Sequence, residues 1–124
     1  MTTTPAISIN GKQVSPGEAT ISVFDHGFLY GDGVFEGIRI YGDRIFRGER
    51  HMRRLFRSAK VIDLKIDYSP IEVLDEIRKT ARTWVDTNGV DLRNNPDPLY
   101  VRVVVSRGDG DLGFEVEMLL PAGT

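Results

Sequence analysis

The stretch VFEGIRIYGDRIFR, residues Val34–Arg47, decides the fold class of this 124-residue chain. Successive side chains of a strand point to opposite faces, so apolar residues at every second position mark a strand with one buried side. In the first arm, Val34–Tyr41, one face would carry Val34, Glu36, Ile38 and Ile40. The pair Gly42-Asp43 favours a tight turn, after which Arg44–Arg47 returns. The stretch therefore predicts an antiparallel β-hairpin.

Two amphipathic helices are predicted after this hairpin. The first, Glu49–Ile62, carries apolar residues at helical spacing, namely Met52, Leu55, Phe56, Ala59 and Ile62. The second, Pro70–Asn88, has a strong start signal, because Ser69 can cap it and Glu72 completes a capping box. Gly89 follows its last residue and suits the left-handed conformation that ends many helices.

Further strands are expected on both sides of this unit. Ala6–Asn10 and a return strand from Val14 would form an N-terminal hairpin around an Asn-Gly turn. Other short strands are expected at Thr20–Phe24, Leu99–Arg107 and Phe114–Leu120. Hairpins dominate, so the chain is predicted to be an α+β domain, a mostly antiparallel β-sheet with two packed α-helices. Its length fits one domain, residues 1–124.

The composition narrows the possible functions. The chain has no cysteine and two histidines, which excludes disulfides and thiolate metal sites, so no metal site is expected. Its net charge of -2 gives no indication of a nucleic-acid partner. No apolar run approaches the ~20 residues of a membrane span, and the first residues do not resemble a signal peptide. We therefore expect a cytoplasmic protein with no membrane or nucleic-acid partner.

The outward faces of two predicted strands are candidate binding surfaces. One face carries an unusual mixture of residues: Phe35, Gly37, Arg39 and Tyr41. A glycine inside a strand marks the close approach of a ligand or backbone, a bulge, or tight packing. On the later strand, Tyr100 and Arg102 share a face and lie on the order of 7 Å apart. A guanidinium fork beside a phenol suits a carboxylate, while an edge strand with a solvated arginine is the alternative.

Arg54 is a candidate phosphate ligand. It lies on the first predicted helix in a stripe with His51 and Ser58, at spacings of three and four residues. A basic side chain with small polar neighbours suits a phosphate, and a solvated surface arginine is the alternative.

Two glycine-rich stretches do not match phosphate-binding loops. Tyr30–Gly33 precedes a predicted strand rather than a helix. Arg107–Gly113 lacks the lysine of a Walker loop and the residue spacing of a calcium loop. The second stretch is therefore predicted to be a flexible hairpin loop.

Taken together, these segments resemble class IV (fold type IV) pyridoxal-phosphate-dependent aminotransferases. Asp25–Arg39, with the sequence DHGFLYGDGVFEGIR, is similar to the signature opening of the branched-chain type. The helix that follows resembles the family, as do the later motifs Tyr100–Arg102 and Arg107–Gly113, in the same order. The resemblance runs from about Ile7 to Gly113 and implies the small, N-terminal domain of such an enzyme.

The resemblance implies roles for seven residues. Arg54 matches the arginine that holds the phosphate of the cofactor, pyridoxal 5′-phosphate. The wall of the pocket for the substrate side chain is matched by Tyr30, Phe35, Gly37 and Arg39. Tyr100 and Arg102 match the pair that recognises a substrate carboxylate. A full-length relative would transfer an amino group between leucine, isoleucine or valine and 2-oxoglutarate. The loop 108–113 matches one that reaches across a dimer, so a homo-oligomer is expected.

The residues Glu36-Gly37 after Phe35 favour the branched-chain type within this family. Aminodeoxychorismate lyases usually have Glu-Thr at these positions. D-amino-acid aminotransferases usually have Glu followed by an aliphatic residue. Both remain alternatives.

Two departures from the family pattern concern the end of the chain. Phe114 follows Gly113 directly, where the family has an Asp-Pro turn and a longer segment, and the chain ends near the expected linker to the large domain. The lysine that forms the Schiff base with the cofactor belongs to that large domain. The four lysines present lie in other contexts: Lys12, Lys60, Lys65 and Lys79. We therefore expect no catalytic residue in this chain, no cofactor bound by it alone and no transaminase activity. A non-catalytic folding or interaction module is the alternative from another class.

Overall fold

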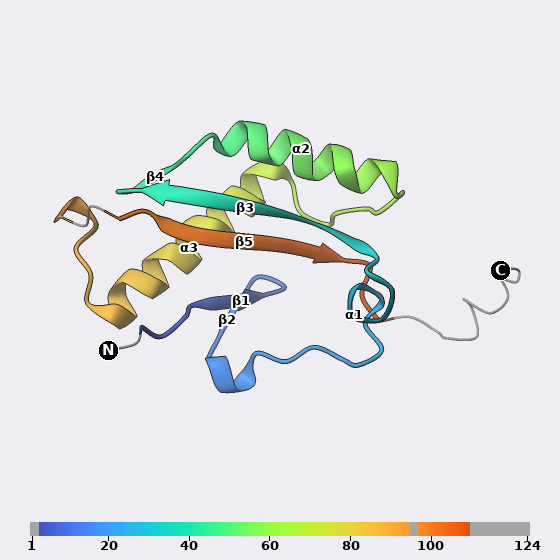
Figure 1. Ribbon diagram of the computed structural model, residues 1–124, viewed down its shortest axis with the longest axis horizontal. Coiled ribbons are helices and arrows are strands. Elements are labelled where there is room, and N and C mark those ends of the chain that lie inside the picture. Colours follow the sequence, from blue (N-terminus) through green and yellow to red (C-terminus); the bar gives the residue numbers. More distant parts are fainter. Residues whose placement is uncertain (1–2, 95–96, 110–124) are drawn as a thin grey trace, which may run out of the picture.

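A three-stranded antiparallel sheet forms the centre of the computed structural model, which describes residues 3–94 and 97–109. Its strands lie in the order β4–β3–β5, with β3 at Gly33–Tyr41, β4 at Arg44–Ile45 and β5 at Leu99–Ser106 (Figure 1). Each strand pairing is antiparallel within the part of the chain that the structure describes. The predicted α+β class and antiparallel sheet are confirmed.

The two faces of β3 differ as the alternating sequence predicted. Along this strand, Glu36, Ile38 and Ile40 are buried, whereas the residues between them are half-buried or exposed. β3 pairs with β5 along its length, from Gly33 opposite Ser106 to Ile40 opposite Leu99. The return strand β4 is shorter than predicted, because Arg47 takes a left-handed backbone conformation with a φ of 54° and leads into the next helix.

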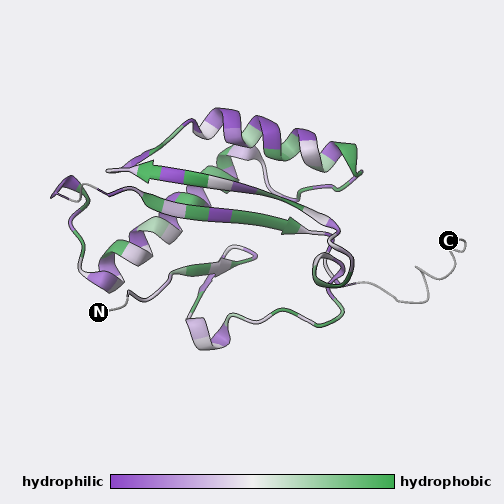
Figure 2. Ribbon diagram, viewed as in Figure 1, coloured by the Kyte–Doolittle hydropathy of each residue, from purple (hydrophilic) through white to green (hydrophobic). Residues whose placement is uncertain are grey.

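Two helices cover the buried face of the sheet. α2 (Gly48–Val61) begins and ends one residue earlier than predicted, and α3 (Pro70–Asn88) has the predicted bounds. Ser69 and Glu72 form the predicted capping box, and Gly89 ends α3 in the left-handed conformation. The sheet and both helices share one core of buried side chains, namely Ile38, Ile40, Met52, Leu55, Ile77, Ala81, Val85 and Leu99. In Figure 2, hydrophobic and hydrophilic residues alternate around both helices, as expected for helices with one packed side.

The N-terminal hairpin forms a separate two-stranded sheet. β1 (Ile7–Ile9) and β2 (Lys12–Val14) are joined by an Asn-Gly turn whose residues both have positive φ, 53° and 80°. The hairpin is fastened to α3 through Glu76, which accepts hydrogen bonds from Ser8 Oγ at 2.5 Å and Gln13 Nε2 at 3.1 Å. A single turn of 3-10 helix, η1 (Pro16–Glu18), follows the hairpin.

The strand predicted for residues 20–24 is wrong. The chain forms no strand there, because no described strand lies beside this segment to pair with it. Its apolar side chains Ile21, Val23 and Phe24 are exposed. A short helix that the sequence did not predict, α1 (His26–Tyr30), follows. Asp25 caps α1 by accepting hydrogen bonds from two backbone amides. A five-residue helix has too few turns to produce a hydrophobic period.

The remaining described elements complete the path of the chain. A second 3-10 turn, η2 (Leu92–Asn94), lies between α3 and β5. The strand predicted at 114–120 lies outside the described residues. Over the ranges 3–94 and 97–109, no helix is both long and apolar enough to span a lipid bilayer.

Candidate functional site

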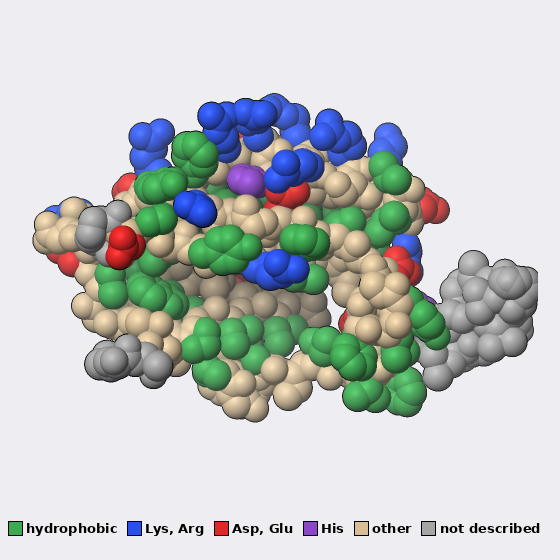
Figure 3. Space-filling view, in the orientation of Figure 1, with side chains coloured by type: hydrophobic (Ala, Val, Ile, Leu, Met, Phe, Trp, Pro, Cys, Tyr) green, Lys and Arg blue, Asp and Glu red, His purple; other side chains and the backbone are tan. Residues whose placement is uncertain are grey.

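The face of β3 and β5 that points away from the helices brings most of the predicted site residues together. The register places Gly37 opposite Arg102 and Arg39 opposite Tyr100. The aromatic side chains on this face are open, with 56% of Phe35 and 63% of Tyr100 exposed. Figure 3 shows these strands from this side, with hydrophobic and basic side chains next to one another. This face, defined by Phe35, Gly37, Arg39, Tyr41, Tyr100, Arg102 and Val104, is called the outer face below.

Gly37 has its place because a tyrosine ring lies across it. A Cβ atom at this position would collide with the Tyr100 hydroxyl and lie 3.1 Å from two ring carbons of the same residue. The register of β3 and β5 runs through Gly37 without interruption, so the strand has no bulge there. Tight packing of a side chain therefore accounts for the glycine in this structure.

Arg102 lies over the ring of Phe35, with its central guanidinium carbon 4.1 Å from the ring centroid. A cation over an aromatic face is attracted by the electrons of the ring. A stacked guanidinium keeps the N–H groups along its edge available for a planar partner such as a carboxylate. The outer face therefore presents the guanidinium of Arg102 and, from two residues earlier on β5, the hydroxyl of Tyr100.

A large cleft lies along β5, between the sheet and the N-terminal hairpin. Its volume is about 1660 Å³, and its lining includes Phe35, Tyr100 and Arg102 together with Phe28 and Trp84. The hollow is visible in Figure 3 below the strands. Pockets for small molecules usually have volumes of about 300–1,000 Å³. The volume of the cleft therefore exceeds that of a typical small-molecule pocket.

Arg54 does not lie on the outer face but at its border, on α2. Its guanidinium holds Glu36 in a two-pronged ion pair, with Nε 2.8 Å from Oε2 and Nη2 2.8 Å from Oε1. His51, one turn earlier on α2, places Nδ1 2.7 Å from the same Oε1. The carboxylate is almost completely enclosed, with 5% of its side chain exposed, whereas 59% of the Arg54 side chain is exposed. Figure 3 shows a histidine and an acidic side chain at this border between α2 and the strands.

The electrostatics of this group favour the charged forms of both partners. The hydrogen bond from Arg54 lowers the pKa of Glu36 below its usual value, and this effect outweighs the burial that raises it. The hydrogen bond from His51 lowers the pKa of Glu36 further. The same ion pair raises the pKa of Arg54. Arg54 is therefore a fixed cation with part of its guanidinium open to a ligand.

Tyr30, like Arg54, is a predicted site residue that the structure does not place on the outer face. It is the last residue of α1, beyond the end of the sheet, and its ring meets His26 edge-on at 5.4 Å between centroids. Arg39 lies on the outer face, exposed, beside Tyr100 in the register.

Glu36 was not predicted as a site residue, and His51 was predicted only as a neighbour of Arg54. The sequence did contain a signal for Glu36, since an acid occupies a core-facing position between Val34 and Ile38. A carboxylate in such a position needs a charged or hydrogen-bonding partner.

The end of the sheet is fastened by a network around Asp25. The side chain of Ser106 donates to Asp25 Oδ1 at 2.5 Å, and the Gly27 amide donates to the same carboxylate oxygen at 2.8 Å. Arg107 donates to both oxygens of Asp32, at 2.7 and 3.1 Å, and to the carbonyl oxygens of residues 62 and 63. The first residues of the loop predicted to be flexible, 107–109, are thus held in place, and the rest of that loop lies outside the described residues.

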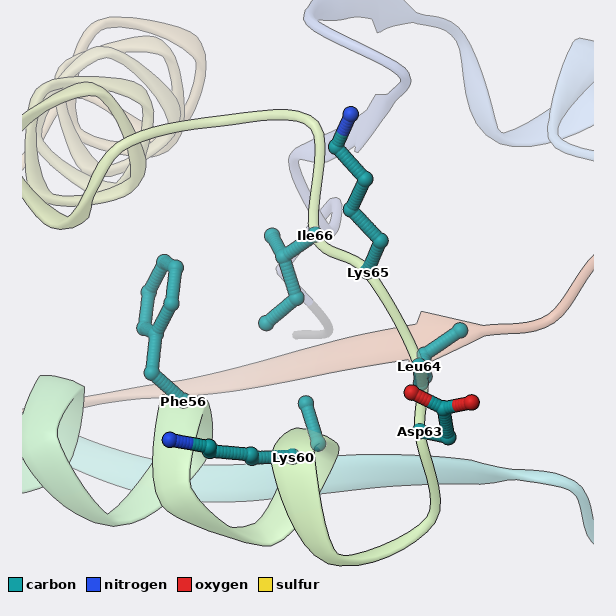
Figure 4. Close-up of a pocket in the computed structure, with 7 residues that line it drawn as sticks. Phe56, Lys60, Asp63, Leu64, Lys65 and Ile66 are labelled. Atoms are coloured by element: carbon teal, nitrogen blue, oxygen red, sulfur yellow. The ribbon is translucent and has the colours of Figure 1, made fainter.

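None of the four lysines is on the outer face, but Lys65 lines the large cleft. Lys60 is on the last turn of α2 and Lys65 on the loop after it, where both line a small pocket of about 170 Å³ (Figure 4). Figure 4 shows their side chains pointing in different directions. Lys12 is on β2, and Lys79 is on α3 with its Nζ 3.6 Å from Glu76.

Comparison with known proteins shows which family this chain resembles. Residues 33–122 match the model of the family described as amino-transferase class IV. A Methanocaldococcus jannaschii protein assigned as a branched-chain-amino-acid aminotransferase is 44% identical over 109 residues, which are 88% of this chain and 34% of that protein. A Staphylococcus aureus D-alanine aminotransferase is 39% identical over 85 residues, which are 68% of this chain and 29% of the enzyme. A Bacillus subtilis aminodeoxychorismate lyase is 35% identical over 108 residues, which are 87% of this chain and 34% of the lyase.

Solved structures agree with these relatives. The branched-chain amino acid aminotransferase from Escherichia coli superposes with a TM-score of 0.67 and 31% identity, over 89% of this chain and 35% of that one. A hypothetical aminotransferase from Mycobacterium tuberculosis, in its PLP-bound form, superposes with a TM-score of 0.69 and 25% identity, over 85% of this chain and 34% of that one. This chain thus spans about a third of the length of the relatives that it matches. Because the family model covers most of the chain and the fold agrees with a solved member, the chain belongs to the class IV aminotransferases.

Proposed function

We propose that this chain is the small domain, residues 1–124, of a pyridoxal-phosphate-dependent branched-chain amino acid aminotransferase. The observation that carries the proposal is the outer face, where Phe35, Tyr100 and Arg102 surround Gly37 and line the large cleft. In the complete enzyme this face would bind the amino acid and the 2-oxo acid in turn. The chain would act in a cytoplasmic homo-oligomer.

Substrate recognition would use the two kinds of chemistry on the outer face. The guanidinium of Arg102 and the hydroxyl of Tyr100 would hold a carboxylate, as a planar fork and a single donor. Phe35 and Gly37 would form the wall against the substrate side chain, together with Arg39 and Tyr30. A face that is aromatic and contains a glycine favours an apolar, branched side chain over a charged one.

Arg54 would hold the phosphate of the cofactor. The residues present fit this role, because Arg54 is a cation fixed on one edge by Glu36 and open on the other. An arginine with free N–H groups binds phosphate oxygens through charge-assisted hydrogen bonds. When bound, pyridoxal 5′-phosphate withdraws electrons from the substrate, while the residues of this chain bind and orient both molecules.

The isolated chain would not catalyse transamination, and it would bind the cofactor only weakly and without a covalent bond. The enzyme family needs a lysine to bond the cofactor and to carry a proton. Lys60 and Lys79 project from helices on the opposite side of the sheet from Arg102, whereas Lys65 lines both the small pocket and the large cleft. The positions of Lys60 and Lys79 on these helices support the proposal that the catalytic lysine belongs to the large domain.

D-alanine transamination is the second candidate within the family. It is favoured by the D-alanine aminotransferases that are up to 39% identical to this chain. The residue after Glu36 argues against it, because a glycine is present where the D-amino-acid type usually has an aliphatic side chain. Aminodeoxychorismate lyase activity is opposed by the same glycine, since threonine is usual there.

A chimeric enzyme tests the proposed function. This chain would replace the matching third of the Methanocaldococcus jannaschii relative, and the product would be assayed for 2-oxoglutarate-dependent conversion of L-leucine and D-alanine. We expect activity with L-leucine, and a strong reduction in Arg102→Ala. Activity with D-alanine alone would refute the branched-chain assignment. A folded chimera that binds the cofactor but converts neither amino acid would favour a non-catalytic module. The unfused chain is the matched control and should be inactive.

A further inference from the structure

The buried carboxylate of Glu36 has a role that the proposed function does not assign. It lies on the helix-facing side of β3 between Val34 and Ile38, where 5% of its side chain is exposed. A carboxylate in such surroundings is costly unless each oxygen is hydrogen-bonded to a charged or polar partner. Glu36 meets this condition with Arg54 and His51, which both come from α2.

His51, Glu36 and Arg54 are linked by hydrogen bonds, with Glu36 between the other two. An ionised carboxylate only accepts hydrogen bonds, so His51 donates through Nδ1 to Oε1. Nε and Nη2 of Arg54 donate to the two oxygens of Glu36. A guanidinium has five N–H groups, and this arrangement directs two of them inward. The Arg54 side chain is 59% exposed, which leaves room for a ligand to approach the remaining N–H groups.

Holding one edge of Arg54 in this way fixes the direction of its other edge. A long side chain at a surface loses rotamer freedom when it binds a ligand, and this loss weakens binding unless the side chain is ordered beforehand. The bidentate pair with a nearly immobile carboxylate provides such order.

We propose that Glu36, held by His51, is a positioning residue that fixes Arg54 for binding a phosphate monoester. The proposal rests on the proposed function, because it takes Arg54 as the phosphate contact of this chain. It makes no use of Glu36 as a ligand, since the carboxylate is enclosed and itself negative.

The substitution Glu36→Gln separates positioning from simple electrostatics. It keeps the size of the side chain and removes one negative charge near the bound anion. Electrostatics alone predicts tighter binding of a phosphate, because a nearby repulsion is removed. Positioning predicts weaker binding, because glutamine offers a single acceptor oxygen and leaves Arg54 mobile. The two explanations therefore predict changes of opposite sign.

The experiment titrates the 124-residue chain with pyridoxamine 5′-phosphate, which has no aldehyde and cannot attach to lysines. Binding would be followed by NMR on the arginine Nε–H signals, with pyridoxamine as the control that lacks the phosphate. Wild type is compared with Glu36→Gln, Arg54→Ala and Asp75→Asn. Asp75 lies on α3 with 63% of its side chain exposed and pairs with Arg78, so Asp75→Asn removes the same charge elsewhere.

We expect wild type and Asp75→Asn to prefer pyridoxamine 5′-phosphate over pyridoxamine, and Arg54→Ala to lose this preference. Glu36→Gln should bind the phosphate compound about three- to tenfold more weakly, the loss expected when one side chain is no longer ordered beforehand. Equal or tighter binding by Glu36→Gln would overturn the positioning role and leave the proposed function intact. Absence of the preference in wild type, or its persistence in Arg54→Ala, would overturn the phosphate role of Arg54 and the inference with it.

A measurement on the wild-type protein tests the positioning role even if the Glu36→Gln variant does not fold. The Nε–H proton of Arg54 should exchange slowly with water, both before and after pyridoxamine 5′-phosphate is added, because Glu36 keeps this hydrogen bond in both states. Fast exchange in the free protein, or loss of protection when the ligand binds, would show that Glu36 does not hold Arg54 for the phosphate.

Discussion

Two glycines of β3 should differ in how strongly the same added methyl group destabilises the domain. Gly37 and Gly33 lie four residues apart on one strand, and both pair with β5. A Cβ on Gly37 would meet the outer end of the Tyr100 side chain, of which 63% is exposed and which can move aside. A Cβ on Gly33 would lie 2.6 Å from the backbone carbonyl oxygen of Val105, which the sheet holds in place.

The expected magnitudes follow from what each methyl group displaces. Replacing a strand glycine by alanine stabilises by about 0.5–1 kcal/mol when the backbone suits it. In Gly37→Ala this gain is offset by the displaced contact with Tyr100, so the free energy of unfolding should change by less than about 1 kcal/mol. In Gly33→Ala the backbone of β5 must shift, at a cost of about 1–3 kcal/mol.

Thermal unfolding of the two variants checks this reasoning. A change of about 1 kcal/mol moves the Tm of a domain of this size by roughly 4 °C or more, so Gly33→Ala should melt several degrees below Gly37→Ala. Gly37→Ala should also shift the NMR signals of the Tyr100 ring, and in a Tyr100→Ala background it should become stabilising. The reasoning is refuted if Gly37→Ala is the less stable of the two, because the Tyr100 ring would then be as rigid as the backbone.

Three further predictions concern the core, acid stability and association. Leu55→Ala should lower the free energy of unfolding by about 2–5 kcal/mol in a urea titration, because Leu55 is completely buried; a loss below about 1 kcal/mol would contradict the packing described. Folding lowers the pKa of Glu36 below about 4.5, the pKa of a glutamate in an unfolded chain. The ionised Glu36 therefore stabilises the fold fully above about pH 4.5, and this stabilisation is lost as the pH falls toward the pKa of the folded state. Stability should therefore fall less steeply below about pH 4.5 in Glu36→Gln than in wild type, and parallel curves would contradict this. The exposed aromatic groups, and the edge of β5 that pairs with no other described strand, should make the isolated chain associate into a homodimer or larger assembly. Solution scattering that gives a radius of gyration of roughly 14 Å at every concentration would show a monomer instead.

Local signals were sufficient for the main elements of the fold. The bounds of α3 were predicted correctly because Ser69, Glu72 and Gly89 act on residues next to them in the chain. The alternation along β3 predicted which side chains are buried. The segment 20–24 shows the limit of such signals, since its apolar residues favour a strand but no described strand lies beside it. Strand propensity has an effect only where a partner strand is present.

Part of the candidate site could likewise be predicted from local sequence signals, and part of it could not. Phe35, Gly37, Tyr100 and Arg102 could be assigned to faces from their spacing, and the sheet register then places them together. The partner of Arg54 could not be assigned in this way. Glu36 lies 18 residues earlier on a different element, and the pairing depends on how α2 crosses the sheet. The reason for Gly37 also required the structure, because the ring that covers it comes from β5.

The long interval between β3 and β5 has a consequence for how the protein is made. Almost every residue of β3 has its partner on β5, and both helices lie between the two strands in the sequence. A ribosome adds about 5–20 residues per second, so β3 emerges roughly 3–12 seconds before the first residue of its partner. During this time the hairpin and the two helices can form, but one edge of β3 has no partner within the chain. Pairing between such edges leads to aggregation. The nascent chain should therefore depend on chaperones most during the synthesis of α2 and α3, before any part of β5 exists.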